Sequence, residues 1–194
     1  MTKTILNLLT TFDGFVAGLN DQIDWIGSTY PPSDNPDIVG KDVKPWDFSA
    51  FTSQVGAIIV GRRSFDIGIE KGWFKNNAYG SSPIFVVCKQ KPETASKDAE
   101  FHFITEGIEV AHKLAVKAAN NKFIYIFGGP SIIQQLLDKD LLDEMWITVA
   151  PILLGKGIRL FDNLSERRID LQQLKVEAHP NSMYEVHYRI LKTK

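Results

Sequence analysis

The stretch FIYIFGGPSIIQQLLDKDLLDE, residues 123–144, sets the fold class of this chain. It opens with a continuous apolar run from Phe123 to Phe127. Such a run without alternation predicts a strand covered on both faces, as in the middle of an α/β sheet. Gly128 and Gly129 predict a turn, because glycine adopts positive φ and leaves no side chain between backbone amides and a ligand. An amphipathic segment follows, so the stretch predicts a strand, a glycine turn and a helix in immediate succession.

Two signals mark the start of this helix. Pro130 suits the first turn of a helix, and Ser131 with Gln134 has the spacing of a capping box if Ser131 is the N-cap. Unpaired N–H groups and the positive end of the helix dipole would then point at the glycine turn, where an anion is favoured. Residues 128–132, here named the Gly128 corner, are therefore a candidate phosphate site; an ordinary tight strand-to-helix turn is the alternative.

Length and composition favour one globular domain over residues 1–194, because 194 residues with 44% hydrophobic content suffice for a full core. Twenty-two basic and 23 acidic residues leave a net charge of −1 without any block of like charge. Neither nucleic acid nor an anionic membrane is therefore an expected partner. The amino terminus has the pattern of neither a signal peptide nor a membrane span. A single cysteine, Cys88, favours the reducing cytoplasm.

The rest of the chain predicts strands that alternate with helices. Apolar and β-branched runs predict strands over residues 4–11, 57–60, 83–87, 101–104 and 145–150. Helical spacing predicts helices over 46–55, from about 64, over 105–120 with Thr105 as the cap, and over 132–142. Residues 171–178 and 183–191 flank a turn signal and predict a hairpin. This order predicts an α/β sandwich with a mostly parallel sheet and an antiparallel carboxyl-terminal hairpin.

Residues 19–45 form a long segment without periodicity, rich in Asn, Asp, Gly, Ser and Pro. Structureless segments of more than about 15 residues are uncommon in compact domains and are often binding loops or lids. Trp25 and Tyr30 argue against plain disorder, which tends to lack aromatic residues. We therefore expect a binding loop.

A second corner repeats the order strand, glycine, helix start. Gly61, Arg62, Arg63 and Ser64, here named the Gly61 corner, follow the strand predicted at 57–60. The planar guanidinium of arginine can donate two parallel hydrogen bonds to phosphate oxygens. The alternative is that these two arginines are solvated surface residues. Ligands of α/β sheets bind beyond the carboxyl ends of the strands, where both corners would lie.

Several other chemistries lack their sequence patterns. The four histidines, at 102, 112, 179 and 187, have no metal-ligand spacing relative to one another or to Cys88, so no metal site is expected. The chain also lacks a GxSxG elbow, a Walker A sequence and a GxGxxG fingerprint.

Four motifs in the chain carry a resemblance to a known family. They are FDGFVA at 12–17, IVGRRSF at 59–65, FGG at 127–129, and LLDE at 141–144 running on to PILLGKGIRLF at 151–161. Together they resemble the RibD carboxyl-terminal domain family of reductases, which is similar in fold to dihydrofolate reductase. The resemblance covers nearly the whole chain, without the deaminase domain of the bifunctional riboflavin enzymes. It implies a dihydrofolate reductase-like three-layer sandwich, closest to the stand-alone relatives.

The resemblance implies NADPH as the cofactor. Gly61, Arg62, Arg63 and Ser64 match the segment that in the family holds the cofactor's phosphates, and an arginine there favours the 2′-phosphate of NADPH over NADH. The second cofactor segment, where family members can have a cis Gly-Gly bond, is matched by Phe127, Gly128, Gly129, Ser131 and Ile132. Val16 and Ala17 match the strand end beside the nicotinamide.

The substrate half of the site rests on fewer residues. Hydride transfer also needs a proton source, and Asp47 resembles the acidic residue of dihydrofolate reductases; a helix cap is the alternative. Asp13, at the end of the first strand, is a second candidate that could instead only shape the turn. Trp25 matches a substrate-covering loop, or anchors that loop. Lys156 and Arg159 could meet a phosphorylated substrate or be solvated charges.

The resemblance therefore implies an NADPH-dependent reductase of a pteridine-, folate- or aminopyrimidine-like substrate, similar to the 5-amino-6-(5-phosphoribosylamino)uracil reductase of riboflavin biosynthesis. The alternative is a non-catalytic NADP(H)-binding module that serves as a sensor or partner protein. Dihydrofolate itself is less favoured, because residues 19–45 do not reproduce the usual folate-site pattern. The family also implies a homodimer, with the last strands as the candidate interface.

Overall fold

The computed structural model of the protein describes residues 2–38, 48–93 and 97–192. Its main strands are β1 (Thr4–Thr11), β3 (Val55–Gly61), β4 (Ile84–Val87), β5 (Phe101–Ile104), β6 (Phe123–Gly128), β7 (Glu144–Ala150), β9 (Asp170–Ala178) and β10 (Tyr184–Leu191). The α-helices are α1 (Phe48–Ser53), α2 (Arg62–Glu70), α3 (Ile108–Ala118) and α4 (Pro130–Asp138). Two short strands, β2 (Phe15–Ala17) and β8 (Ile158–Arg159), pair separately, and 3-10 turns lie at η1 (Leu19–Asp21) and η2 (Lys75–Asn77).

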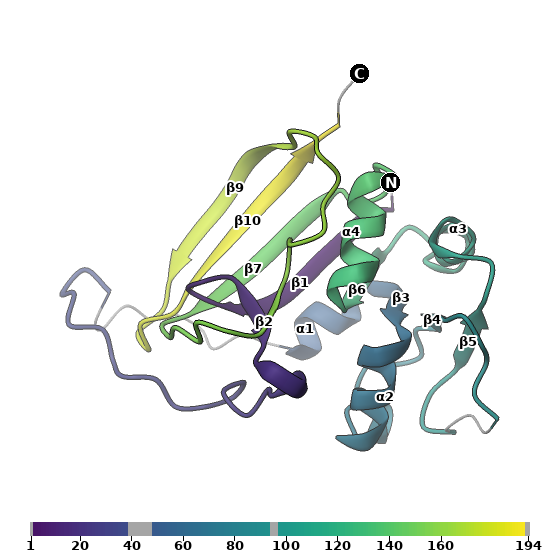
Figure 1. Cartoon of the computed structure of the whole chain (residues 1–194), viewed down its shortest axis with the longest axis horizontal. Helices are drawn as coiled ribbons and strands as arrows, with labels where there is room; N and C mark the ends of the chain where they lie inside the picture. The colour runs from purple at the N-terminus through teal and green to yellow at the C-terminus, as the bar shows by residue number, and fades with distance from the viewer. Residues whose placement is uncertain (1, 39–47, 94–96, 193–194) are drawn as a thin grey trace.

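The eight main strands form one sheet in the order β5-β4-β3-β6-β1-β7-β10-β9 (Figure 1). All neighbours from β5 to β7 are parallel, and β10 pairs antiparallel with both β7 and β9. The predicted mostly parallel sheet with an antiparallel carboxyl-terminal hairpin is therefore confirmed.

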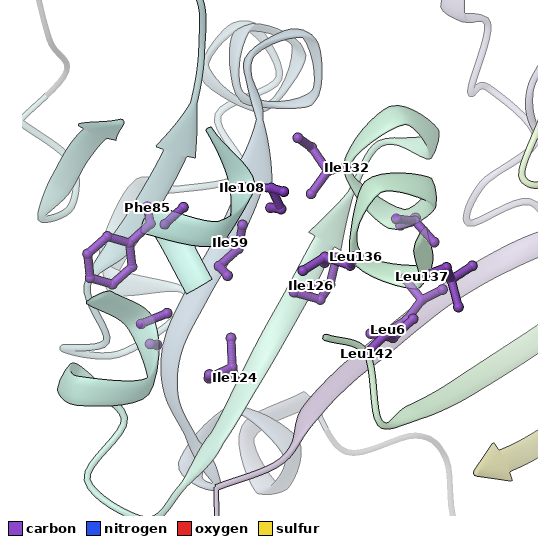
Figure 2. Packing of buried hydrophobic residues seen from close by; sticks show 14 of the residues in the cluster. Leu6, Ile59, Phe85, Ile108, Ile124, Ile126, Ile132, Leu136, Leu137 and Leu142 are labelled. Carbon is purple, nitrogen blue, oxygen red and sulfur yellow. The ribbon is translucent and has the colours of Figure 1, made fainter. Parts of the chain in front are cut away.

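Both faces of the parallel part of the sheet are covered by helices, which gives three layers. Side chains alternate between the faces of a strand, so Ile124 and Ile126 of β6 join the core under α3 and α4. Tyr125 points to the opposite face and packs with Phe51 of α1 and Phe65 of α2. Figure 2 shows the first core, where side chains from β1, β3, β6 and α4 gather. This covering explains why β6 is a continuous apolar run.

Two helix starts differ from their predictions. The helix predicted from Thr105 begins at Ile108, because Gly107 has φ 101°, a conformation that favours glycine and ends the preceding extended chain. Helix α4 begins at Pro130 with Gly129 as its N-cap, so Pro130 in the first turn is confirmed and Ser131 as N-cap is wrong. The side chain of Gln134 donates to the carbonyl of Leu160 at 3.0 Å instead of completing a capping box.

None of the helices within the described ranges has the length and apolarity that crossing a membrane requires.

Candidate functional site

The two glycine corners lie next to each other at one edge of the sheet. Strands β3 and β6 are parallel neighbours, with Val60 opposite Gly128, so the carboxyl ends of both strands lie side by side. Helix α2 begins directly after Gly61 and α4 directly after Gly129. No described side chain caps the first amides of either helix. Two helix N-termini with uncapped N–H groups therefore meet where an anion is favoured.

The corners also contact each other directly. A Cβ added to Gly61 would lie 2.8 Å from Cγ1 of Ile132, and a Cβ added to Gly129 would lie 2.8 Å from Oγ of Ser64. Gly128 has φ 139°, and the Gly128–Gly129 bond is cis. Residues that sequence reasoning assigned to two separate cofactor segments are thus in direct contact, and the close packing of Ile132 and Ser64 requires glycine at positions 61 and 129.

Arg62 is held on the outer side of α2. Its Nε donates to both carboxylate oxygens of Asp66 at 2.9 Å, and its Nη1 donates to the carbonyl of Gln90 at 3.0 Å. Because Gln90 follows β4, the guanidinium lies between the Gly61 corner and the loop beyond β4. Arg62 can therefore reach a group that projects past the neighbouring strand end.

Arg63 has a different partner. Its Nε donates to the carboxylate oxygens of Asp21 at 2.9 and 2.7 Å, and this hydrogen bond raises the pKa of the Arg63 guanidinium above its ordinary value. The contact ties the η1 turn to the first turn of α2. Each arginine of the Gly61 corner is thus paired with a carboxylate, but the two differ in position, since Arg62 extends toward the loop beyond β4 and Arg63 toward η1.

Val16 and Ala17 lie in β2, which continues from the carboxyl end of β1 and pairs with β8. A Cβ added to Gly157 would lie 2.2 Å from the carbonyl oxygen of Ala17, so only glycine permits this close approach. Arg159 packs its guanidinium over the ring of Phe15, 4.4 Å from the centroid. The strand end predicted beside the nicotinamide is therefore fixed in place by β8, at the same sheet edge as the corners.

Asp13 holds two turns together. Its carboxylate accepts hydrogen bonds from Thr11 Oγ1 at 2.5 Å, from the backbone N–H of Gly155 at 2.8 Å and from that of Leu154 at 3.2 Å. The Thr11 hydroxyl and these amides lower the pKa of Asp13 below its ordinary value. An ionised carboxylate that accepts these bonds is suited to shaping the turn and poorly suited to giving a proton. Asp47, the other acidic candidate, lies outside the described residues.

Trp25 is buried and anchors its loop. It packs with Tyr30 against Ala150 at the end of β7, and the Tyr30 hydroxyl donates to the Trp25 carbonyl at 2.6 Å. Farther along, the N–H of Ser33 donates to the Pro180 carbonyl at 2.7 Å, which ties the loop to the turn of the β9–β10 hairpin. The indole Nε1 of Trp25 is buried without a hydrogen-bond partner among the described residues.

Sequence reasoning missed two polar features of the structure. Asn7 of β1 is only 8% exposed, and its side-chain Nδ2 has no partner in the described part of the chain. An open cavity lies between the loop at residues 20–26 and the residues Lys71 and Trp73 that follow α2. A lone asparagine inside an apolar strand and a tryptophan inside a polar segment were the signals available. No group of three metal-ligating side chains occurs within the described ranges.

Known proteins resemble this chain along nearly its whole length. The uncharacterized protein YyaP of Bacillus subtilis (strain 168) is 28% identical over 198 residues, which cover 96% of this chain and 94% of YyaP. A crystal structure from Shewanella sp. PV-4, of a protein whose proposed role is riboflavin biosynthesis, is 26% identical with a TM-score of 0.77, covering 98% of this chain and 100% of the other.

A third comparison reaches a bifunctional enzyme. The diaminohydroxyphosphoribosylaminopyrimidine deaminase/5-amino-6-(5-phosphoribosylamino)uracil reductase of Thermotoga maritima has a TM-score of 0.63 at 15% identity, which shows a shared fold. The match covers 98% of this chain and 57% of the Thermotoga chain. Finally, the family model of the RibD C-terminal domain matches residues 2–184. The protein therefore belongs to the RibD C-terminal domain family.

Proposed function

We propose that the protein is an NADPH-dependent reductase that acts on a small heterocycle of the pteridine, folate or aminopyrimidine class. The observation that carries the proposal is the direct contact between the two glycine corners, since it brings the uncapped N-termini of α2 and α4 together. Family membership supports the same reaction, in which the heterocycle gains a hydride from NADPH and a proton, and NADP⁺ leaves.

The chain offers distinct groups to distinct parts of the cofactor. The first amides of α2 and α4 would donate to the pyrophosphate oxygens, and Gly61 and Gly129 allow the two helix N-termini to pack this closely. Arg62 would receive the 2′-phosphate, because its guanidinium lies toward the loop beyond β4. The bound cofactor supplies the hydride, while these residues bind and orient it. We retain Asp47 as the proposed proton donor and assign Asp13 a positioning role.

A non-catalytic NADP(H)-binding module is the second candidate. The hydrogen bonds that keep Asp13 ionised favour it, because they leave this carboxylate unsuited to donate a proton. Such a module would bind NADPH without consuming it in the presence of any heterocycle of the three proposed classes. Oxidation of NADPH followed at 340 nm, with pterin, dihydrofolate and aminopyrimidine acceptors, separates the two functions.

The cofactor assignment is tested by titrating the protein with NADPH and with NADH while following tryptophan fluorescence. We expect NADPH to bind at least about tenfold more tightly, since a charge-assisted hydrogen bond contributes about 1.5–3 kcal/mol. Arg62→Ala should remove most of this difference. Arg63→Ala is the matched control, because Arg63 extends toward Asp21 of η1 and not toward the loop beyond β4, and it should change both affinities equally. Equal loss for both cofactors in Arg62→Ala removes the 2′-phosphate assignment, and binding of neither by the wild type removes the proposal.

We further propose that the protein forms a homodimer through β9. This strand is an edge of the main sheet, and its Leu171, Leu174 and Val176 are 40–54% exposed. An edge strand with exposed apolar residues readily pairs with another chain. Sedimentation velocity should show a dimer for the wild type and a monomer for Leu174→Lys; a monomeric wild type contradicts the proposal.

A further inference from the structure

The open cavity beside the candidate cofactor site has a volume of about 610 Å³. One wall consists of residues 20–24 and Ile26, and the other of Lys71 and Trp73. The Trp73 ring lies 5.7 Å from that of Phe127, the residue directly before the Gly128 corner. Small-molecule sites commonly measure about 300–1,000 Å³, so the cavity can hold a bicyclic ring with a short tail.

The lining combines three apolar residues with five polar or charged ones. Trp73, Ile23 and Ile26 offer the apolar part, against which a planar ring can pack. Asn20 and Gln22 add side-chain amides that can donate and accept hydrogen bonds.

The charges of the lining are balanced. Asp21 is already bonded to Arg63, which neutralises it. Asp24 and Lys71 form no ion pair with any residue in the described ranges, so one carboxylate and one ammonium face the same cavity. Among the described lining residues, no positive charge remains in excess. A phosphate dianion would meet one cation together with an unpaired carboxylate, whereas a neutral ring with amino and carbonyl groups would satisfy both charges.

Arg159 does not change this balance. It donates to the Asp13 carbonyl at 2.8 Å and packs over Phe15, and it lies outside the cavity lining. Of the two residues considered for a phosphorylated substrate, Arg159 is therefore already engaged, and Lys156 is likewise outside the lining.

We propose that this cavity binds the hydride acceptor, and that the acceptor is a non-phosphorylated heterocycle carrying an exocyclic amino group and a ring carbonyl. The amino group donates to Asp24, the carbonyl accepts from Lys71, and the ring packs on Trp73. The inference rests on the proposed reductase function, because the acceptor must lie beside the nicotinamide.

The test uses the full chain saturated with NADP⁺, and as probes neopterin and neopterin monophosphate, which differ only in the phosphate. Isothermal titration should show that neopterin binds and that the phosphate does not improve its affinity. Neopterin monophosphate binding tenfold or more tightly, or no binding of either probe, would overturn the assignment of the acceptor class. Binding of the dinucleotide is measured first and separately, so a failure of the proposed cofactor site is recognised independently.

Variants of the lining residues test whether the probe binds in the cavity. Asp24→Asn should weaken neopterin binding about tenfold with unchanged NADPH affinity, whereas Asp34→Asn, an exposed carboxylate outside the lining, should change neither. Lys71→Gln and the control Lys75→Gln form a second pair with the same expectation. The indole N–H signal of Trp73, identified with Trp73→Phe, should shift when neopterin is added. An unshifted Trp73 signal, or equal effects of a variant and its control, would overturn the location.

Discussion

Replacing Gly61 by alanine tests the contact between the two glycine corners. The backbone conformation of Gly61, with φ −78° and ψ 153°, is allowed for any residue, so alanine adds no backbone strain there. The new methyl group therefore acts only through its contacts. It would lie 2.8 Å from Cγ1 of Ile132, about 1 Å closer than an ordinary carbon–carbon contact. Overpacking of this kind lowers the free energy of unfolding by about 1–3 kcal/mol. It should also weaken NADPH binding, because the first turns of α2 and α4 must move apart.

A double-variant cycle tests whether the contact with Ile132 causes the lower free energy of unfolding. Ile132→Ala alone should cost about 2–5 kcal/mol, since Ile132 is 5% exposed and its removal leaves a cavity. In the double variant the methyl of residue 61 occupies part of that space, so the combined loss should fall short of the sum by about 1 kcal/mol or more. Urea unfolding followed by tryptophan fluorescence, with and without NADPH, gives the four values. Additive losses, or Gly61→Ala as stable as the wild type, would refute the described packing.

Three further changes have definite expected outcomes. Asn7→Leu should raise the free energy of unfolding by about 1 kcal/mol in thermal denaturation, because it removes a buried donor without a described partner; a loss of stability would contradict this. The lowered pKa of Asp13 means that its ionised form stabilises the fold above the ordinary pKa of 3.8, and that this contribution disappears as the pH falls through the folded-state pKa. The stability advantage of the wild type over Asp13→Asn should therefore shrink below about pH 4, and a constant difference between pH 7 and pH 3 would speak against it. Gly157→Ala should displace β2 and abolish NADPH binding, since the new Cβ would lie 2.2 Å from the Ala17 carbonyl; unchanged binding in the fluorescence titration would exclude this.

The fold was predictable because its signals are local. The unbroken apolar run of β6, the two glycines after it and Pro130 each report on a few neighbouring residues, and each was confirmed. Reliance on local signals also misplaced the start of α3. Thr105 is a good cap by residue type, but the positive φ of Gly107 decides where the chain turns, and a sequence pattern does not display φ.

The candidate site was only partly predictable, because several of its contacts join distant residues. Both corners follow from strand-end glycines, so local sequence finds them. The Asp21–Arg63 pair joins residues 42 positions apart, and the ring contact between Trp73 and Phe127 joins residues that are likewise distant in the sequence. Trp25 suggested a covering loop by position, yet its burial depends on Ala150 and Met183 from the far half of the chain. No local pattern encodes these contacts.

The central place of β1 in the sheet has a consequence for how the chain acquires its structure. Thr4 pairs with Ile124 and Ile5 with Glu144, so β1 finds its neighbours only after β6 and β7, more than a hundred residues later in the chain, have been synthesised. Until then its apolar side chains remain exposed to solvent or bound to a chaperone. Contacts of such long sequence separation slow folding, because the intervening loop must close first. Completion of β7, well over a hundred residues later, is therefore the event that commits the nascent chain to its native topology.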